Sequence, residues 1–246
     1  MRIKIFVLLC LTAIMQFTGV TPLKASHYYY KQLSLKDGVT SAVRCILTDK
    51  QGFVWIGTKA GISRYDGHEL KKYVHSPNNP HSIPNNLIHQ IAEDEMSNIW
   101  ILTDKGIARY QRQSDDFFLP TDEKGNPIIA YSTCLTKDGV LFGSKDKVYF
   151  YSYRDSSLRL LQKLNKGSNF NISLLSLWNE HTVLCCSRWQ GLALLDLKTG
   201  KHRLPPFDCG KEIMNMLIDS QNRIWIAPYN EGIKCFTHNG ELVKAY

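Results

Sequence analysis

A unit of about 43 residues recurs along this chain, and it constrains the fold more strongly than any local propensity. In three places an Asp precedes a Trp by six positions, and a Gly follows that Trp by six or seven. The three sets are Asp49, Trp55 and Gly61; Asp94, Trp100 and Gly106; and Asp219, Trp225 and Gly232. Such a specific spacing seldom repeats by chance, so the chain is predicted to stack equivalent structural units.

Two weaker copies of the unit lie between the second and third clear ones. Residues 132–153 place Phe142 where the Trp would stand, and residues 174–197 place Cys185 there, with Gly191 at the glycine position. The five marker positions are then separated by 45, 42, 43 and 40 residues. The sequence therefore predicts five copies of one unit.

Each unit divides into four short runs of strand-forming residues. In the first unit these runs are VRCILTD, FVWIGT, ISRYD and HELKKYV, and the last follows Asp66-Gly67, a dipeptide that favours hairpin turns. Four antiparallel strands in 40 to 50 residues are typical of a β-propeller blade. We therefore predict an all-β fold, a β-propeller of four-stranded antiparallel blades. The five units span approximately residues 41–75, 86–119, 128–162, 171–204 and 212–246.

The repeated residues have predicted structural roles. An Asp in the first turn of a unit can accept a hydrogen bond from a backbone N–H two residues on. The Trp side chains are expected to pack between blades, with a neighbouring turn accepting the indole N–H. The last unit has its own fourth strand at 241–246, so a spare strand at Tyr28–Leu35 has no blade to complete. We expect an incomplete ring, with a complete small propeller as the alternative.

The N-terminus has the layout of a secretory signal peptide. Arg2 and Lys4 precede an uncharged stretch from Ile5 to Leu23, and cleavage after Ala25 fits the small residues there. Residues 1–25 are therefore predicted to direct export and residues 26–246 to form the propeller. An uncleaved membrane anchor is the alternative, although the strongly apolar core is short for a span of about 20 residues.

Composition and motifs exclude several classes of function. The formal net charge is +8, but no run of Lys and Arg exceeds two residues, which argues against nucleic-acid binding. We find no P-loop, dinucleotide fingerprint, nucleophile elbow or metal-ligand spacing of His with Glu, so no cofactor, no metal and no catalytic residue is predicted. The six cysteines beyond the signal peptide match no zinc pattern and are expected to act as small hydrophobes; Cys185 and Cys186 should face opposite sides of a strand.

The first two units, at Arg44–Asp66 and Gln90–Tyr110, resemble the two-component regulator propeller repeat. Residues from Tyr30 onward resemble the start of the periplasmic sensor region of hybrid two-component systems in gut Gram-negative anaerobes. The resemblance covers nearly all of residues 28–246. It implies a longer parent that carries two propellers, a β-sandwich, a membrane helix, a histidine kinase, a receiver and a DNA-binding domain, and that senses oligosaccharides from complex glycans.

The expected function follows from this resemblance. We expect a periplasmic, glycan-sensing propeller segment without kinase or DNA-binding parts, which is not itself an enzyme. Its expected partners are an oligosaccharide and either the remaining sensor domains or a homodimer partner. It would contact a membrane only through the parent protein or an uncleaved signal. The alternatives are a stand-alone propeller that serves as a protein-interaction module or as a polysaccharide-active lyase.

Two loops carry the candidate ligand-binding residues. Loops that join the second and third strands of propeller blades lie on one face near the central axis. Here Trp189 and Tyr229 occupy such loops, where the first two units carry charged or small residues. An exposed ring can stack on a sugar, and Arg188 or Asn230 beside it can bond hydroxyl groups. The alternative is that Trp189 packs inside the blade in place of the missing Trp of the fourth unit.

Overall fold

The computed structural model describes residues 42–164, 170–210 and 212–246, which all lie in one compact unit of the chain, Ser34–Tyr246. The predicted signal peptide and the predicted strand at Tyr28–Leu35 lie outside the described residues. The described residues include no helix, so none is long and apolar enough to span a bilayer.

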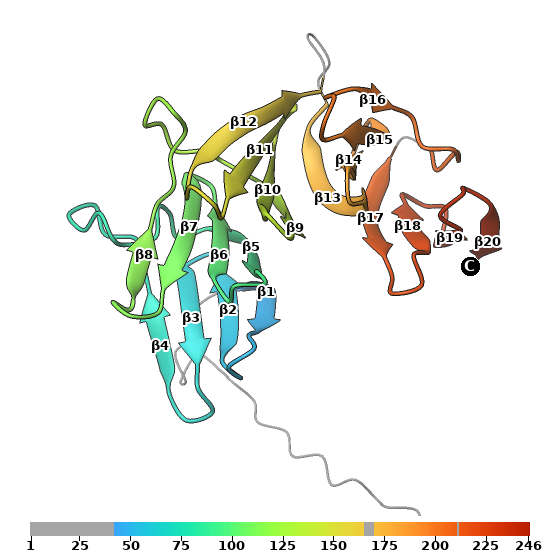
Figure 1. The fold of residues 1–246 in the computed structure, drawn as a ribbon. Coiled ribbons are helices and arrows are strands. Elements are labelled where there is room, and N and C mark those ends of the chain that lie inside the picture. Colours follow the sequence, from blue (N-terminus) through green and yellow to red (C-terminus); the bar gives the residue numbers. More distant parts are fainter. Residues whose placement is uncertain (1–41, 165–169, 211) are drawn as a thin grey trace, which may run out of the picture. The chain divides into compact units, whose positions relative to one another are not determined.

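The described residues form five antiparallel sheets, which follow one another along the chain and are each made of four consecutive strands (Figure 1). We call them blades 1 to 5. Blade 1 contains β1 (Val43–Thr48), β2 (Val54–Thr58), β3 (Gly61–Tyr65) and β4 (Leu70–Tyr73). Blade 2 contains β5 (Ile88–Glu93), β6 (Ile99–Thr103), β7 (Gly106–Gln111) and β8 (Asp116–Phe118). Blade 3 contains β9 (Ser132–Thr136), β10 (Gly139–Ser144), β11 (Lys147–Ser152) and β12 (Leu158–Lys163).

The last two blades repeat this pattern. Blade 4 contains β13 (Ile172–Asn179), β14 (Thr182–Ser187), β15 (Gly191–Asp196) and β16 (His202–Arg203). Blade 5 contains β17 (Ile213–Ile218), β18 (Ile224–Pro228), β19 (Lys234–Phe236) and β20 (Leu242–Ala245). The predicted all-β architecture of five four-stranded antiparallel blades is confirmed. Among the described strands, no ladder joins one sheet to another, so none of the sheets closes on itself or on its neighbour.

The apolar core of the described residues is divided into four clusters, each lying between two successive blades. Along the second strand of a blade, alternate residues face the preceding and the following blade, as the two-residue period of a strand requires. In β6, for example, Ile99 and Ile101 join the cluster shared with blade 1, whereas Trp100 and Leu102 join the cluster shared with blade 3. Blades 2, 3 and 4 are therefore each buried on two sides by different sets of their own residues.

The strand register corrects the marker residue in blades 3 and 4. In blade 1, Trp55 lies three positions before Thr58, which pairs with Gly61 across the hairpin. In blade 4 the equivalent pair is Ser187 with Gly191. The residue that matches Trp55 is therefore Leu184 and not Cys185. The same comparison places Leu141, rather than Phe142, at this position in blade 3, where Ser144 pairs with Lys147.

The one-residue difference matters because it reverses the face that a strand residue occupies. Phe142 packs against Trp100 of the preceding blade, with ring centroids 5.3 Å apart. Leu141 instead belongs to the cluster shared with blade 4. In blade 4, Leu184 lies in the cluster shared with blade 5, and Cys185 lies in the one shared with blade 3.

One hydrogen-bonding arrangement links the Asp and the Trp of the repeat. Asp49 Oδ1 accepts hydrogen bonds from the backbone N–H groups of Gln51 (3.0 Å) and Phe53 (2.9 Å), which closes the turn between β1 and β2. Asp49 Oδ2 accepts the indole N–H of Trp55 at 3.0 Å. The predicted turn capping by Asp is confirmed, and the carboxylate that caps the turn is also the partner of the buried indole.

The other two clear repeats contain the same arrangement. Asp94 Oδ2 accepts the indole N–H of Trp100 at 2.8 Å, and Asp219 Oδ2 accepts that of Trp225 at 2.8 Å. Burial raises the pKa of Asp49, but hydrogen bonds from Trp55 and Arg112 outweigh it and hold that pKa below its usual value. The carboxylate thus stays charged, which strengthens the bonds it accepts.

Two of the three Trp residues pack between blades as predicted. Trp55 meets Tyr110 of blade 2 edge-on, and Trp100 meets Tyr151 of blade 3 in the same way, each with ring centroids 4.8 Å apart and an interplanar angle of 65°. Trp225 differs, because it is only partly buried and belongs to none of the four inter-blade clusters among the described residues. Because no described sheet follows blade 5, inter-blade packing of Trp225 stays a prediction.

The repeated glycines lie at the hairpins between second and third strands. Gly61 has φ of +114°, and a Cβ there would stand 2.5 Å from the carbonyl oxygen of Tyr73. Gly232 has φ of +76°, and a Cβ would stand 2.0 Å from the carbonyl oxygen of Tyr246. Glycine is required at both positions because the fourth strand passes close to the hairpin. Gly106 and Gly191 begin the third strands of blades 2 and 4.

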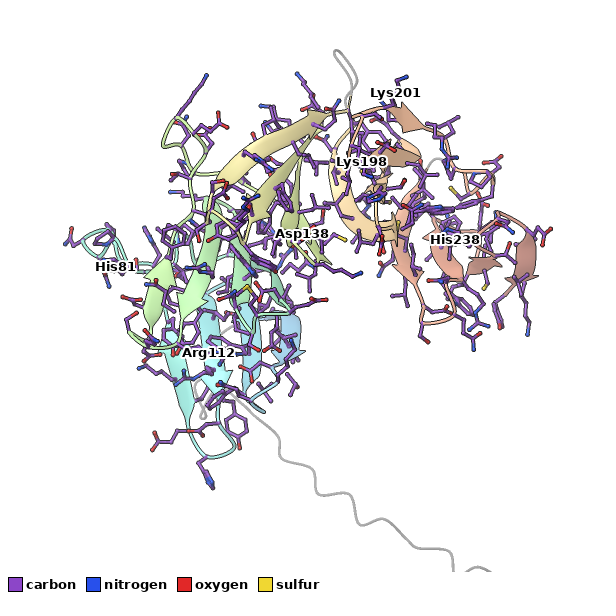
Figure 2. The ribbon with its side chains drawn as sticks, in the orientation of Figure 1. His81, Arg112, Asp138, Lys198, Lys201 and His238 are labelled. Carbon is purple, nitrogen blue, oxygen red and sulfur yellow. The ribbon has the colours of Figure 1, made fainter. Side chains whose placement is uncertain are left out.

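A network of hydrogen bonds and ion pairs joins blade 1 to blade 2. Asp115 Oδ1 accepts hydrogen bonds from the hydroxyls of Tyr73 (2.6 Å) and Tyr110 (2.5 Å), and Asp115 Oδ2 pairs with Lys71. Burial raises the pKa of Asp115, but these bonds, with that from Lys71 the largest, lower it to about 2. Arg112 (labelled in Figure 2) adds a second link, since its guanidinium lies 3.0 Å from Asp49 Oδ2 of blade 1.

The cysteines behave as the sequence predicts. All six are free thiols, and five of them are buried. Cys185 and Cys186 lie in different inter-blade clusters, which confirms that they face opposite sides of β14. Burial raises the pKa of Cys134 to about 11 and that of Cys186 to about 12, so both remain protonated and apolar at neutral pH.

Replacing Asp49 by Ala should destabilise the protein, because the turn loses its cap and a fully buried indole N–H loses its acceptor. We expect the free energy of unfolding in urea to fall by about 2 kcal/mol or more. Asp219→Ala is the matched control and should give a smaller loss, since water can reach the partly exposed Trp225. Equal losses in the two variants would contradict the role assigned to indole burial.

The charged network should make stability depend on acid pH. The pKa of Asp115 is lower in the folded protein than in the unfolded chain, so the unfolded chain takes up this proton first as the pH falls. The contribution is fully present above about pH 5 and is lost towards about pH 2. Asp115→Asn should therefore flatten the fall in urea midpoint between pH 5 and pH 3. An unchanged pH dependence would contradict this.

Candidate functional site

The two hairpins that carry the predicted binding residues flank the start of strand β17. Arg188 and Trp189 lie in the β14–β15 hairpin, and Tyr229 and Asn230 lie in the loop between β18 and β19. The backbone carbonyl of Arg188 accepts a hydrogen bond from the N–H of Ile213 at 2.9 Å. The backbone N–H of Tyr229 donates to the carbonyl of Glu212 at 2.8 Å. Residues 212 and 213 thus hold both hairpins at one edge of blades 4 and 5.

Both aromatic rings are presented to solvent. Trp189 is 62% exposed and Tyr229 is 53% exposed. The alternative that Trp189 packs inside the blade is wrong, because its side chain faces solvent. The cluster between blades 4 and 5 is filled by other residues, among them Trp178 of β13. Its ring stacks on Phe207, with centroids 6.2 Å apart, and lies 4.3 Å from the ring of His238 (labelled in Figure 2) at an angle of 34°.

Polar groups accompany each ring. The guanidinium carbon of Arg188 lies 5.3 Å from the centroid of the Trp189 ring, and one guanidinium nitrogen lies 3.3 Å from Met214 Sδ. These contacts place a positive charge next to the indole at the surface. Asn230 has φ of +60°, in the left-handed region that Asn tolerates in tight turns, and its side chain is exposed. The site thus offers a ligand the aromatic faces of the two rings, the positive charge of Arg188 and the side-chain amide of Asn230.

A hollow adjoins the hairpin of Trp189. Its volume is about 600 Å³, and it is lined by Gln190–Leu192 and by the connection Leu204–Gly210 between blades 4 and 5. The lining includes apolar side chains, two prolines and backbone polar groups, which suits a ligand with both apolar and hydroxyl surfaces. The sequence did not indicate this hollow, because its two walls come from segments separated by a whole strand.

Blade 2 carries a second polar cluster at the corresponding edge. His89 Nε2 lies 2.5 Å from Asp104 Oδ1, and the imidazole meets the ring of Tyr131 edge-on at 5.5 Å. His89 is the second residue of β5, the first strand of blade 2, Asp104 lies in the β6–β7 hairpin, and Tyr131 directly precedes β9. No short-range spacing links these residues, so sequence reasoning missed the cluster. Within the described residues, no group of three or more His, Cys, Asp and Glu could hold a metal ion.

Comparison with known proteins identifies what the chain resembles. Residues 37–60 match the family model described as two component regulator propeller, which confirms the resemblance predicted from the repeat. A curated histidine kinase, P4 of Formosa agariphila, is 37% identical over 59 residues. That match covers 24% of this chain and 4% of the kinase.

Solved structures with the same fold include extracellular domains from B. thetaiotaomicron. One, described as belonging to a hybrid two-component system, has a TM-score of 0.69 and 19% identity and covers 85% of this chain. Another of that description has a TM-score of 0.65 and 21% identity over 84% of this chain. The chain spans 30% and 28% of the lengths of these two domains. Because identity is this low, the likeness shows the propeller fold.

Proposed function

We propose that this protein is a periplasmic ligand-sensing propeller segment of a hybrid two-component signal-transduction regulator, and that its ligand is an oligosaccharide. The match to the two-component regulator propeller model and the fold shared with extracellular domains of such systems support the signalling role. The signal-peptide pattern of residues 1–25 supports export.

The exposed rings of Trp189 and Tyr229 carry the proposal for the ligand. Trp and Tyr bury large apolar areas when they dock against a partner, and they lose little conformational entropy in doing so. A pyranose presents C–H groups on its faces and hydroxyls at its rim, so it matches a ring flanked by the guanidinium of Arg188 or the amide of Asn230. The hollow beside Trp189 can take further sugar units.

The proposed signal is a shift in population. An oligosaccharide that binds one arrangement of the sensor domains more tightly than another stabilises the first arrangement. The size of the effect is the difference between the free energies of binding to the two arrangements. The propeller segment itself performs no catalysis in this scheme. The partners it needs are the remaining sensor domains or a second sensor copy, and any contact with a membrane comes through them.

Loss of the rings should weaken binding of the oligosaccharide. We expect Trp189→Ala and Tyr229→Ala each to reduce affinity about tenfold, because one stacked ring contributes roughly 1 to 1.5 kcal/mol. The measurement is calorimetry with the best ligand found by screening a panel of plant and host oligosaccharides. Leu160→Ala, an exposed apolar position on β12, is the matched control and should bind as the wild type does.

The other outcomes separate the alternatives. Cleavage of a polysaccharide by the purified protein, with loss of activity in His89→Ala, would favour the lyase instead. If no oligosaccharide of the panel binds, or if both ring variants bind as well as the wild type, the proposed site is wrong. A protein partner whose binding requires Trp189 would then favour the interaction module.

A further inference from the structure

Positive side chains gather at the outer edge of blade 4. The turn after β15 and the short strand β16 carry Lys198, Lys201 and Arg203, and all three residues are exposed; the two lysines are labelled in Figure 2. Among the residues that the structure describes, no carboxylate lies within ion-pair distance of any of the three. This edge therefore has uncompensated positive charge.

The turn that carries the two lysines is held in one shape. Asp196 Oδ1 accepts the backbone N–H groups of Lys198 at 3.0 Å and of Thr199 at 2.6 Å. Gly200 has φ of +70°, and its carbonyl oxygen accepts a hydrogen bond from the side-chain amide of Gln162 in blade 3 at 2.9 Å. Asp196 thus caps the turn, and it is one carboxylate beside three cations.

Blade 1 shows what a cation at this register position can bind. Arg203 pairs with Leu194 of the third strand, and Lys71 occupies the same position in blade 1. Lys71 forms an ion pair with Asp115 of the following blade. No described carboxylate of blade 5 reaches Arg203 in this way. The position that holds an internal ion pair in blade 1 is therefore open to an external anion in blade 4.

A hollow of about 410 Å³ lies at these cations, and we call it the cationic hollow. Leu194 belongs to the apolar cluster shared with blade 5, so Arg203, which lies directly opposite Leu194, faces the same side of the sheet. Blade 4 is flanked by described blades on both sides, and this is the side that faces blade 5. The hollow is lined by Thr182, Leu194, Asp196, Thr199, Lys201, His202 and Arg203.

The cationic hollow adjoins the hollow beside Trp189. On the third strand, Leu192 lines the hollow of Trp189 and Leu194 lines the cationic one, and both leucines face the side shared with blade 5. On the other wall the neighbours Leu204 and Arg203 divide in the same way. Strand β15, which runs along both hollows, has six residues and is about 17 Å long. An elongated ligand can therefore contact both hollows at once.

We propose that the ligand is an acidic oligosaccharide, with a sugar ring on Trp189 and a carboxylate or sulfate group between Lys201 and Arg203, an assignment that rests on the proposed function. The guanidinium group presents paired N–H donors that match two oxygens of such a group, and the lysine adds a compact positive charge. A neutral sugar cannot neutralise these cations. The cationic hollow thus selects for charge, whereas the ring of Trp189 accepts any suitable sugar face.

Three ligands of equal length test the charge preference on the full chain. They are tetragalacturonate, which carries carboxylates, a chondroitin sulfate tetrasaccharide, which also carries sulfate esters, and cellotetraose, which is neutral. We expect at least one acidic ligand to bind about tenfold more tightly than cellotetraose in calorimetry at low ionic strength. Its affinity should fall as NaCl is added, because salt screens exposed charges. Comparison of the two acidic ligands shows which acid group is preferred.

Double variants locate the acid group. Lys201→Gln with Arg203→Gln should lower affinity for the acidic ligand about tenfold and flatten its salt dependence. Lys201→Arg with Arg203→Lys keeps both charges and should bind more tightly than the Gln pair. Lys124→Gln with Arg154→Gln removes two exposed cations outside the hollow and should bind as the wild type does. All four positions are exposed, so the urea midpoint should not change.

The contrary results separate this inference from the proposed function. Equal affinity of the wild type for all three ligands, or unchanged affinity of the Gln pair for the acidic ligand, overturns the acidic ligand; the proposed function still stands if Trp189→Ala weakens binding. If no oligosaccharide binds, the proposed function itself fails. Binding of a polyglutamate peptide that requires Lys201 and Arg203, in the absence of any sugar binding, would assign the cationic hollow to an acidic protein partner and overturn both.

Discussion

The hydrogen bond between a turn carboxylate and a buried indole is the interaction on which each well-formed blade depends. A Trp can fill the space between two sheets only if its N–H is satisfied there, because an unpaired donor in an apolar interior is costly. The Asp at the β1–β2 turn satisfies it and at the same time fixes the turn. Turn shape, strand register and inter-blade packing are thereby set by two side chains six residues apart, as at Asp49 and Trp55.

Blades 3 and 4 show how the fold tolerates loss of this pair. Neither has the Asp and Trp combination, and Leu141 and Leu184 occupy the Trp positions with no donor to satisfy. Leu141 shares its cluster with Leu175 of blade 4, and Leu184 shares its cluster with Trp178 of its own blade, which stacks on Phe207. An apolar residue of different shape can replace the Trp because the alternation of buried residues along the second strand is kept.

The candidate site follows from the same scaffold. Rigid sheets hold short hairpins at one edge, and residues in those hairpins are free of packing demands, so they can carry rings and charges that the core would not accept. Trp189 and Tyr229 are exposed although each is large and apolar, and neighbouring backbone bonds to residues 212 and 213 fix the two hairpins beside one another. Surface rings on rigid supports are suited to recognition, whereas the buried Trp residues are suited to stability.

The sequence by itself determined the repeat, the four strands of each blade, the capping role of Asp49 and the apolar, unpaired state of the cysteines. These follow from local rules, because turn chemistry and strand alternation act over a few residues. It also placed Trp189 and Tyr229 in loops, but it could not decide whether Trp189 packs inside the blade or faces solvent. The structure decided it, because Trp189 is exposed and the cluster between blades 4 and 5 is filled by other residues, Trp178 among them.

Only the tertiary structure decided the rest. The marker positions of blades 3 and 4 differ by one residue from the sequence spacing, because turn lengths vary while the hairpin pairing is kept. The cluster of His89, Asp104 and Tyr131 joins residues from two blades, which no short-range pattern can reveal. The exposure of Trp225, which shares its motif with two buried Trp residues, depends on what stands beside the blade. A motif specifies which surface a blade builds, and the neighbouring sheet decides whether that surface is buried.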